Sequence, residues 1–482
     1  MNRNTSHHRR DFLHWGVSGL GATALVDLLQ SDGRAMGHAP ARVVIPRAKR
    51  AIQICLIGGL SHVDSFDYKP GLADRHGKSL GTTEAPAIFF GRVGLLRKND
   101  WKFRQRGNSG LWASDMFPHI SGLMDDLTVV RSMVTESANH TPALFFENSG
   151  FEFNGFPSLG SWLSFGLGSE TENLPAYVVL PDGRGGPNGG ASNWSNGFLP
   201  SQHQGVVFRS KYEAGADTQT HPVRDLFPAR NTSAEAEQDI QRFLAEVHSQ
   251  SRERGGGDPI LEARMRSYSL AAKMQLSVPE VSDLSQEPQR MLDAYGLDRA
   301  ETADCGSRCL LGRRLLERGV RFVQIYSGGP ISGEPRLSWD AHEDVVKNHT
   351  NQATLIDQPV AALVQDLKQR GMLDDTLVLF TTEFGRTPFT QADADKVGKG
   401  RDHNRYGFSI WMAGAGLVPG MAYGATDELG WKSVEHPTTW HDLHATILHL
   451  LGLDHERLTY YHNGIQRRLT NVHGEVIRGI LA

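Results

Sequence analysis

The 482-residue chain contains few cysteines, no excess of positive charge and no internal repeat. Its three cysteines are too few for a disulfide framework. The 50 Lys and Arg residues are outnumbered by 54 Asp and Glu, which gives a formal net charge of −4. Because the chain lacks the basic field that holds a polyanion, we expect no nucleic-acid partner. The lack of a repeat argues against solenoid and propeller architectures.

Long apolar runs are also scarce, and the one near the N-terminus (15–29) is too short to span a membrane and is interrupted by Asp27. It follows RRDFL at 9–13, a form typical of twin-arginine signals, and APA at 39–41 is a small-x-small cleavage motif. We therefore expect residues 1–41 to be a twin-arginine signal peptide that engages the export machinery. The mature chain would be periplasmic or otherwise exported, with no transmembrane segment. The alternative is an accidental Arg-Arg pair in a disordered tail.

From residue 49 onward, short apolar runs alternate with helical patterns, which predicts an α/β fold. Strands are expected at 51–57, 127–133, 176–180, 320–326, 376–381, 408–413 and 421–424. Helices are expected at 116–126 (capped by Ser114), 142–148, 158–166, 305–318, 352–370 and 440–451, with a helical insertion at about 234–300. Because the apolar strands are interpreted as buried on both faces, we predict a three-layer sandwich around a largely parallel sheet, spanning residues 49–482.

Acidic and histidine side chains follow four of the predicted strands. They are His62, Asp64 and Asp67 after 51–57, His140 after 127–133, Asp340 and His342 after 320–326, and Glu383, Asp402 and His403 after 376–381. In open α/β sheets, ligands bind beyond the carboxyl ends of the strands, so we expect these side chains to meet at one edge.

Mixed carboxylates and imidazoles suit Zn²⁺, Mn²⁺ or Fe²⁺ and, where imidazoles are fewer, Mg²⁺ or Ca²⁺. The D-x-H spacing of Asp340 and His342 places both side chains on one side of an extended segment. Arg386 follows Glu383 by three residues and is suited to hold a sulfate, phosphate or carboxylate. The sequence therefore predicts a divalent-metal and anion site, with an ordinary network of loop ion pairs as the alternative.

Several segments resemble a family of exported bacterial proteins known as domain of unknown function 1501, which lies near the sulfatases. They are GGLSHVDSFDYKP, WDAH, TTEFGRTP, GRDH and DLHATILHLLGLDHERLTY, and the resemblance extends from about Lys49 to the end of the chain. The wider resemblance is to the alkaline phosphatase and sulfatase superfamily. It implies one or two metal ions at the carboxyl edge of an α/β sandwich.

The resemblance also implies roles for individual residues. Glu383 stands where the superfamily carries the Asp of an Asp-His-Gly motif, and Phe384 replaces the histidine that follows. His403 resembles a later metal-binding histidine. The remaining proposed ligands are Asp340 with His342, His62 or Asp64 for the first-strand aspartate, and Asp402 beside His403.

The sequence differs from the sulfatase pattern at the position of the nucleophile. His140 stands where their cysteine would be and Leu144 replaces their arginine, so no formylglycine can form. Thr141 could serve as the nucleophile, or a metal-activated hydroxide could attack directly. These features predict a periplasmic metal-dependent hydrolase of sulfate or phosphate esters, acting on a small-molecule or glycan ester through His140, Thr141 and Arg386. The alternative is a catalytically inactive relative that binds sulfated glycan or another anion, and a metal carrier is a weaker third interpretation.

Overall fold

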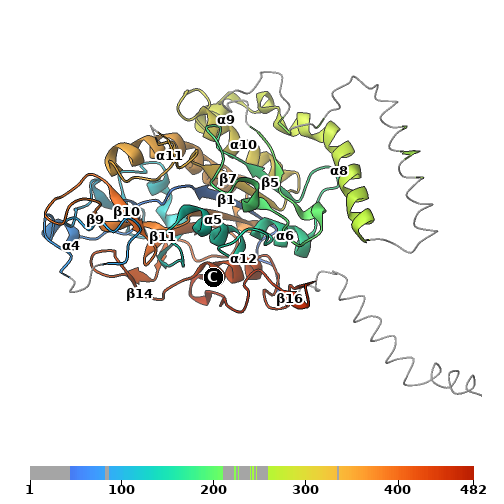
Figure 1. Cartoon of the computed structure of the whole chain (residues 1–482). Helices are drawn as coiled ribbons and strands as arrows, with labels where there is room; N and C mark the ends of the chain where they lie inside the picture. Colours follow the sequence, from blue (N-terminus) through green and yellow to red (C-terminus); the bar gives the residue numbers. More distant parts are fainter. Residues whose placement is uncertain are drawn as a thin grey trace, which may run out of the picture.

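The computed structural model describes residues 44–81, 86–209, 259–333 and 336–482, together with isolated positions between 222 and 246. The expected signal peptide at 1–41 lies outside these residues. The described chain is built around one eight-stranded sheet (Figure 1). In spatial order its strands are β12 (Met421–Tyr423), β4 (Leu127–Met133), β11 (Phe408–Ala413), β8 (Thr376–Thr382), β1 (Arg50–Leu56), β7 (Phe322–Ser327), β5 (Tyr177–Leu180) and β6 (Val206–Val207).

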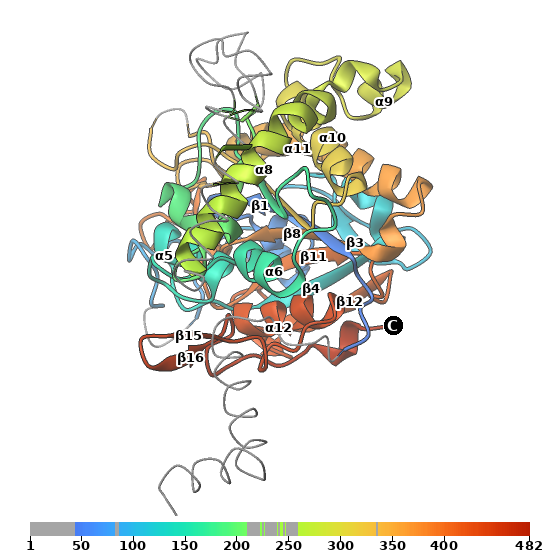
Figure 2. The ribbon, with the colours of Figure 1, turned by 90° about the vertical axis from the view of Figure 1, so that its right-hand side faces the viewer.

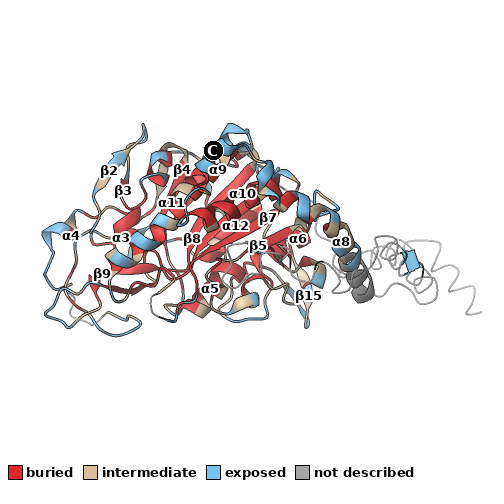
Figure 3. Cartoon of the chain, turned by 90° about the horizontal axis from the view of Figure 1, so that it is seen from above, coloured by how far each residue is buried: buried red, intermediate tan, exposed pale blue. Residues whose placement is uncertain are grey.

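The sheet is parallel except at β11, which runs antiparallel to both of its neighbours, β4 and β8. The predicted strands are confirmed, with ends shifted by at most two residues. Seen from above, the strands of this sheet are largely buried (Figure 3). This agrees with the apolar runs that predicted them, and the expected largely parallel α/β sheet is confirmed.

Alternate residues of each strand enter one of two hydrophobic cores. Ile52, Ile54 and Leu56 of β1 pack on one face with three helices. Those helices are α8 (Pro259–Ser282), α10 (Ala303–Glu317) and α11 (Val345–Gln369). Ala51 and Cys55 pack on the other face. The helices there are α5 (His140–Ser149), α6 (Leu159–Leu167) and α12 (Trp440–Leu450), so the molecule has the three expected layers (Figures 1 and 2).

One predicted helix is shorter than expected. Residues 116–126 contain only the 3₁₀ helix η1 (Ile120–Asp126), and Ser114 lies in a strand instead of capping a helix. Pro118 disfavours helical backbone at the preceding residue. The Asp357 carboxylate then accepts the backbone N–H groups of His119 and Ile120, each at 2.8 Å, and so fixes where the helix begins.

The remaining elements are short. The helices are α3 (His62–Ser65), α4 (Gly71–Asp74) and α9 (Gln289–Ala294), and α8 and α9 lie within the expected helical insertion. The small antiparallel pairs are β2 (Phe103–Arg106) with β3 (Leu111–Ser114), β9 (Gly385–Thr390) with β10 (Arg401–Asn404), β13 (Ala425–Thr426) with β14 (Ser433–Glu435), and β15 (Tyr460–His462) with β16 (Ile465–Arg467). None of the described helices has the length and apolarity needed to cross a bilayer.

Candidate metal centre

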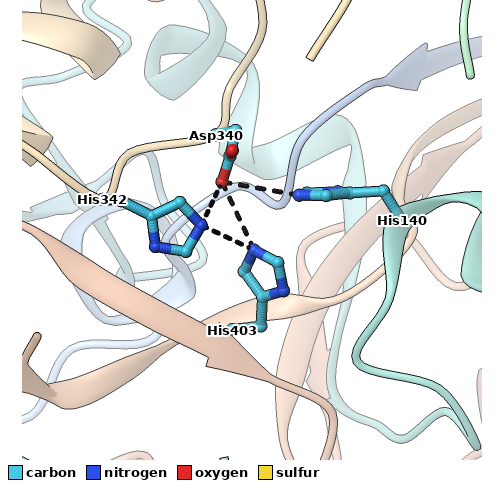
Figure 4. A group of neighbouring side chains, drawn as sticks. All are labelled: His140, Asp340, His342 and His403. Carbon is cyan, nitrogen blue, oxygen red and sulfur yellow. Dashed lines mark hydrogen bonds and ion pairs between the residues drawn. The ribbon is translucent and has the colours of Figure 1, made fainter. Parts of the chain in front are cut away.

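Four of the predicted site residues meet beyond the carboxyl ends of the central strands (Figure 4). His140 is the first residue of α5, on the segment that follows β4. Asp340 and His342 lie between β7 and α11, and His403 lies in β10. The segment after β7 is held close to the end of β1, because Trp339 N–H donates to the Ile57 carbonyl at 2.7 Å. Residues more than 250 positions apart in the chain thus share one site.

The Asp340 Oδ1 atom is the centre of this group. It lies 2.7 Å from His342 Nε2, 3.3 Å from His403 Nε2 and 3.4 Å from His140 Nε2 (Figure 4). The four candidate ligand atoms lie within 4.8 Å of one another. Within the described chain, this is the one group of at least three histidine, cysteine or acidic side chains with such geometry.

The outer nitrogen of each imidazole contacts an oxygen acceptor. His140 Nδ1 lies 2.8 Å from Glu383 Oε1, and His403 Nδ1 lies 2.5 Å from the Ala138 carbonyl. His342 Nδ1 contacts Gln391 Oε1. These oxygens accept hydrogen bonds, so they favour a proton on each Nδ1 and leave each Nε2 as a lone-pair donor that faces Asp340. Metal-binding histidines are commonly held in this way.

With the proton on Nδ1, the Nε2 atoms that face Asp340 carry no proton to donate. His342 Nε2 and His403 Nε2 lie 2.9 Å apart. His140 Nε2 is buried and has no hydrogen-bond partner among the described residues. Lone pairs that face each other at this distance repel unless a cation lies between them. The orphaned nitrogen, the facing pair and the N₃O donor set therefore fit a divalent transition-metal ion.

Ionisation in the group follows from burial and from its neighbours. Burial disfavours the Asp340 carboxylate, but the positive charge of Arg386 and the contacts with the three imidazoles outweigh it and hold the pKa of Asp340 far below its usual range. Burial also opposes protonation of His140, yet its contacts with Asp340 and Glu383 raise its pKa. Burial, together with the neighbouring His140, holds the pKa of His403 well below its ordinary value. The site thus keeps one firmly ionised carboxylate.

Two arginines flank that carboxylate. Arg386 Nη2 lies 2.6 Å from Asp340 Oδ1, and Arg336 Nη1 lies 2.5 Å from Oδ2. Arg386, predicted to hold an anion, is fully buried. Its other donors reach the carbonyl oxygens of Gly58, Gly59 and Arg401. An anion would have to compete with these contacts for the guanidinium.

Four predicted ligands lie outside the group. His62 Nε2 contacts the Gly430 carbonyl at 2.8 Å. Asp64 pairs with Arg401, whose Nε lies 2.9 Å from Oδ2, and this charge outweighs burial so that the pKa of Asp64 is lowered. The Asp402 carboxylate accepts the backbone N–H groups of His403 at 2.7 Å and of Phe90 at 3.0 Å.

Glu383, the fourth, contacts the group without joining it. It holds His140 Nδ1, and its two oxygens accept the backbone N–H groups of Gly58 at 2.8 Å and Gly59 at 3.2 Å. Glu383 therefore supports a candidate ligand and ties the ends of β1 and β8 together.

Two further positions of the resemblance lie beside the cluster. Thr141 is the second residue of α5, directly after His140, and is half-buried. Phe384 packs against two of the imidazoles, with ring centroids 4.9 Å from His140 and 4.4 Å from His403. Phe384 therefore packs against the two imidazoles at the position where the superfamily pattern has a histidine.

Sequence reasoning missed several contributors. Gln391, Arg336 and the Ala138 carbonyl contact the candidate ligands but belong to no recognisable motif. Two exposed phenylalanines, Phe89 and Phe90, also contact the imidazoles. No signal in the sequence marked this pair, because its exposure and its contacts with the imidazoles are visible only in the structure.

Comparison with solved structures finds distant similarities. A phosphonate monoester hydrolase from Silicibacter pomeroyi is 13% identical, with a TM-score of 0.36, and the match covers 90% of this chain and 76% of that one. A sulfatase from Pseudoalteromonas sp. is 14% identical, with a TM-score of 0.35 and coverage of 87% and 74%. An alkaline phosphatase from the Antarctic bacterium TAB5 is 9% identical, with a TM-score of 0.30 and coverage of 77% and 92%.

Comparison of sequences identifies the family, which the distant structural similarities do not. No curated protein matches the chain. The family described as protein of unknown function (DUF1501) matches residues 48–481, which is almost the whole of the described fold. The chain therefore belongs to the DUF1501 family.

Proposed function

We propose that this protein is an exported metal-dependent hydrolase of phosphate or sulfate esters. The observation that carries the proposal is the convergence of three Nε2 atoms on Asp340 Oδ1, each imidazole being held through Nδ1 by an acceptor. Packing alone does not explain so many buried polar groups in one place, because each costs desolvation energy unless it is paired.

His140, Asp340, His342 and His403 are the proposed metal ligands. Three imidazoles and one carboxylate favour Zn²⁺ or Mn²⁺ over Ca²⁺ or Mg²⁺, which prefer oxygen ligands. When bound, such an ion polarises an ester oxygen and lowers the pKa of a water molecule. Glu383, Gln391 and the Ala138 carbonyl orient the imidazoles and fix their tautomers.

Arg386 and Thr141 have separate proposed roles. The 2.6 Å contact of Arg386 with Asp340 favours a role in keeping that carboxylate ionised and aimed at the imidazoles. Thr141 stands at the N-terminus of α5, where the helix dipole favours a developing negative charge. We propose its hydroxyl as the nucleophile toward phosphorus or sulfur. The threonine oxygen would bond to phosphorus or sulfur as the bond to the alcohol oxygen breaks, and the hydroxyl proton would leave with that alcohol.

The proposal is tested by loading the purified protein with Zn²⁺ or Mn²⁺ and screening 4-nitrophenyl phosphate, phosphonate and sulfate esters. We expect turnover of at least one ester that disappears when the ion is removed by a chelator. Thr141→Ala should reduce kcat by several orders of magnitude with metal content unchanged, and Thr141→Ser should restore part of it. Absence of turnover with every ester and ion would overturn the hydrolase proposal.

A catalytically inactive anion-binding protein is the second candidate. It is favoured by one observation, namely that Arg386 already supplies a positive charge to the shared Asp340 oxygen. This candidate predicts no ester turnover, together with binding of sulfated glycan. The ester screen and a titration with heparin-like oligosaccharide therefore separate the two.

A further inference from the structure

Two exposed phenylalanines lie against the candidate metal centre. The ring of Phe89 stacks on His403 with centroids 5.1 Å apart and planes inclined by 27°. The ring of Phe90 meets His342 edge-on at 4.7 Å. The side chains remain 44% and 51% exposed, so each ring offers surface to solvent directly beside a proposed ligand.

The two rings are held in place by the protein. They contact each other edge to face at 4.9 Å. Phe90 N–H donates to Asp402 Oδ2 at 3.0 Å, and Oδ1 of the same carboxylate accepts the N–H of His403 at 2.7 Å. Farther along, Gly94 N–H donates to the Thr390 carbonyl of β9 at 2.8 Å. Asp402 thus positions a proposed metal ligand and the aromatic pair together.

This arrangement places an apolar surface next to a cluster of imidazole and carboxylate side chains. A group bound at the cluster through its anionic end would extend past His342 and His403 and meet the two rings. Aromatic rings bind flat apolar faces, either another aromatic ring or the C–H face of a sugar, and short alkyl groups offer them little area.

We propose that Phe89 and Phe90 form a platform that contacts the alcohol part of the substrate ester, and that this part carries a flat apolar face, an aryl or a pyranose ring. The proposal rests on the proposed function for the position of the anionic group. Phe89 and Phe90 are then specificity-determining residues, and Asp402 is a positioning residue.

The experiment measures binding, so that it stands apart from turnover. Zinc-loaded protein is titrated calorimetrically with methylphosphonate and phenylphosphonate, which share the anionic group and differ in the flat face. A parallel arm, carried out with Thr141→Ala so that the esters are not hydrolysed, compares glycerol 3-phosphate with glucose 1-phosphate. We expect at least one ring-bearing probe to bind about tenfold more tightly than its partner, and the arm that shows the preference identifies an aryl or a sugar ring.

The double substitution Phe89→Ala with Phe90→Ala should reduce this preference to about twofold or less, with zinc content unchanged. Phe153→Ala is the matched control, because Phe153 is an aromatic residue that is 71% exposed and lies beyond the other end of α5 from His140. It should keep the full preference.

Three results would overturn the proposal: no preference for either ring in the wild type, a preference that survives the double substitution, or loss of zinc in the double variant, which would make the pair only a cover for the metal. A wild type that prefers the ring-bearing probe but hydrolyses no ester would retain the platform and reject the hydrolase.

Discussion

At the level of single residues, the site depends on groups that hold the imidazoles from outside. Gln391 is the clearest case, since its side-chain oxygen contacts His342 Nδ1 and no sequence motif marks it. Without that acceptor, His342 can rotate or change tautomer, and its Nε2 is no longer fixed as a lone-pair donor.

Gln391→Ala should weaken zinc affinity about 10- to 100-fold while the fold is retained. Competition with a chromophoric chelator measures this change. Gln105→Ala, at an exposed position of β2, is the control and should leave the affinity unchanged. Equal affinities for both variants would show that Gln391 does not support a metal ligand.

Asp64 has the side chain of a metal ligand, but it forms a buried ion pair instead. The sequence predicts a metal ligand, but the carboxylate is fully buried against Arg401 at 2.9 Å and also accepts the Ser61 hydroxyl at 2.6 Å. Removing one partner of a buried ion pair leaves an uncompensated charge, which costs about 3–5 kcal/mol.

Asp64→Asn should therefore lower the free energy of unfolding by about 3–5 kcal/mol in urea denaturation and leave the zinc stoichiometry of the folded fraction unchanged. Asp393→Asn removes the exposed partner of Arg92 and should cost less than about 1 kcal/mol. Zinc loss by folded Asp64→Asn would instead make Asp64 a ligand.

At the level of elements, the main strands were predictable because apolar runs bounded by turn residues carry their own signal. The pair β9 and β10 was not, because buried polar residues such as Arg386, Asp402 and His403 hide the strand pattern. The expected order of the strands indicated which segments meet at the edge of the sheet, but only tertiary contacts decide which side chains face Asp340. The choice of Arg401 as the partner of Asp64 could not be derived from spacing.

The turn after β1 shows how one element positions another. Gly58 has φ of +116°, and a Cβ atom there would lie 2.4 Å from the Asp340 nitrogen and 2.7 Å from the Trp339 nitrogen. Because both neighbours are backbone atoms of the segment that carries Asp340, they cannot move aside without displacing Asp340.

Gly58→Ala should therefore reduce zinc affinity and also destabilise the fold by more than the roughly 1–3 kcal/mol of backbone strain alone. Gly77→Ala is the matched control, since Gly77 has φ of +78° with no atom within 4 Å of the added Cβ. It should show the strain cost and full zinc affinity, as measured by thermal denaturation and metal titration. If the two variants lose equal stability and both bind zinc normally, the close approach at Gly58 does not position Asp340.

At the scale of the whole molecule, the first prediction concerns location. Twin-arginine export carries folded proteins, so a metal centre assembled from distant segments would be complete before transport. Changing Arg9 and Arg10 to lysine should leave the protein in the cytoplasm, as measured by cell fractionation, with metal content like that of the wild type. The same change at Arg104 and Arg106 on β2 is the control and should not alter its location. Export of the Arg9 and Arg10 variant at the wild-type level would contradict the proposed signal.

The second prediction at this scale concerns the stability of the whole fold as a function of pH. Glu147 of α5 is fully buried against the sheet, and its Oε1 accepts hydrogen bonds from Thr381 at 2.6 Å and Gln53 at 3.2 Å. Its Oε2 has no partner among the described residues. Burial outweighs these hydrogen bonds and raises the pKa of Glu147 from 4.5 to about 8.

Between these two pKa values, the folded protein holds a proton at Glu147 that the unfolded chain has released. The stabilisation from this group is therefore complete below about pH 4.5 and is lost as the pH rises toward 8, by at most about 1.4 kcal/mol per pH unit.

Glu147→Gln keeps the shape of the neutral acid but cannot release a proton in this pH range. Urea unfolding should give similar free energies for both proteins at pH 5 and should favour the glutamine variant by a few kcal/mol at pH 8. Glu152→Gln, just beyond α5 and half-buried, is the control and should leave the wild-type pH dependence in place. A constant difference between Glu147→Gln and the wild type across this range would show that Glu147 is ionised in the folded protein, because only a proton held there and released on unfolding gives the two curves different slopes.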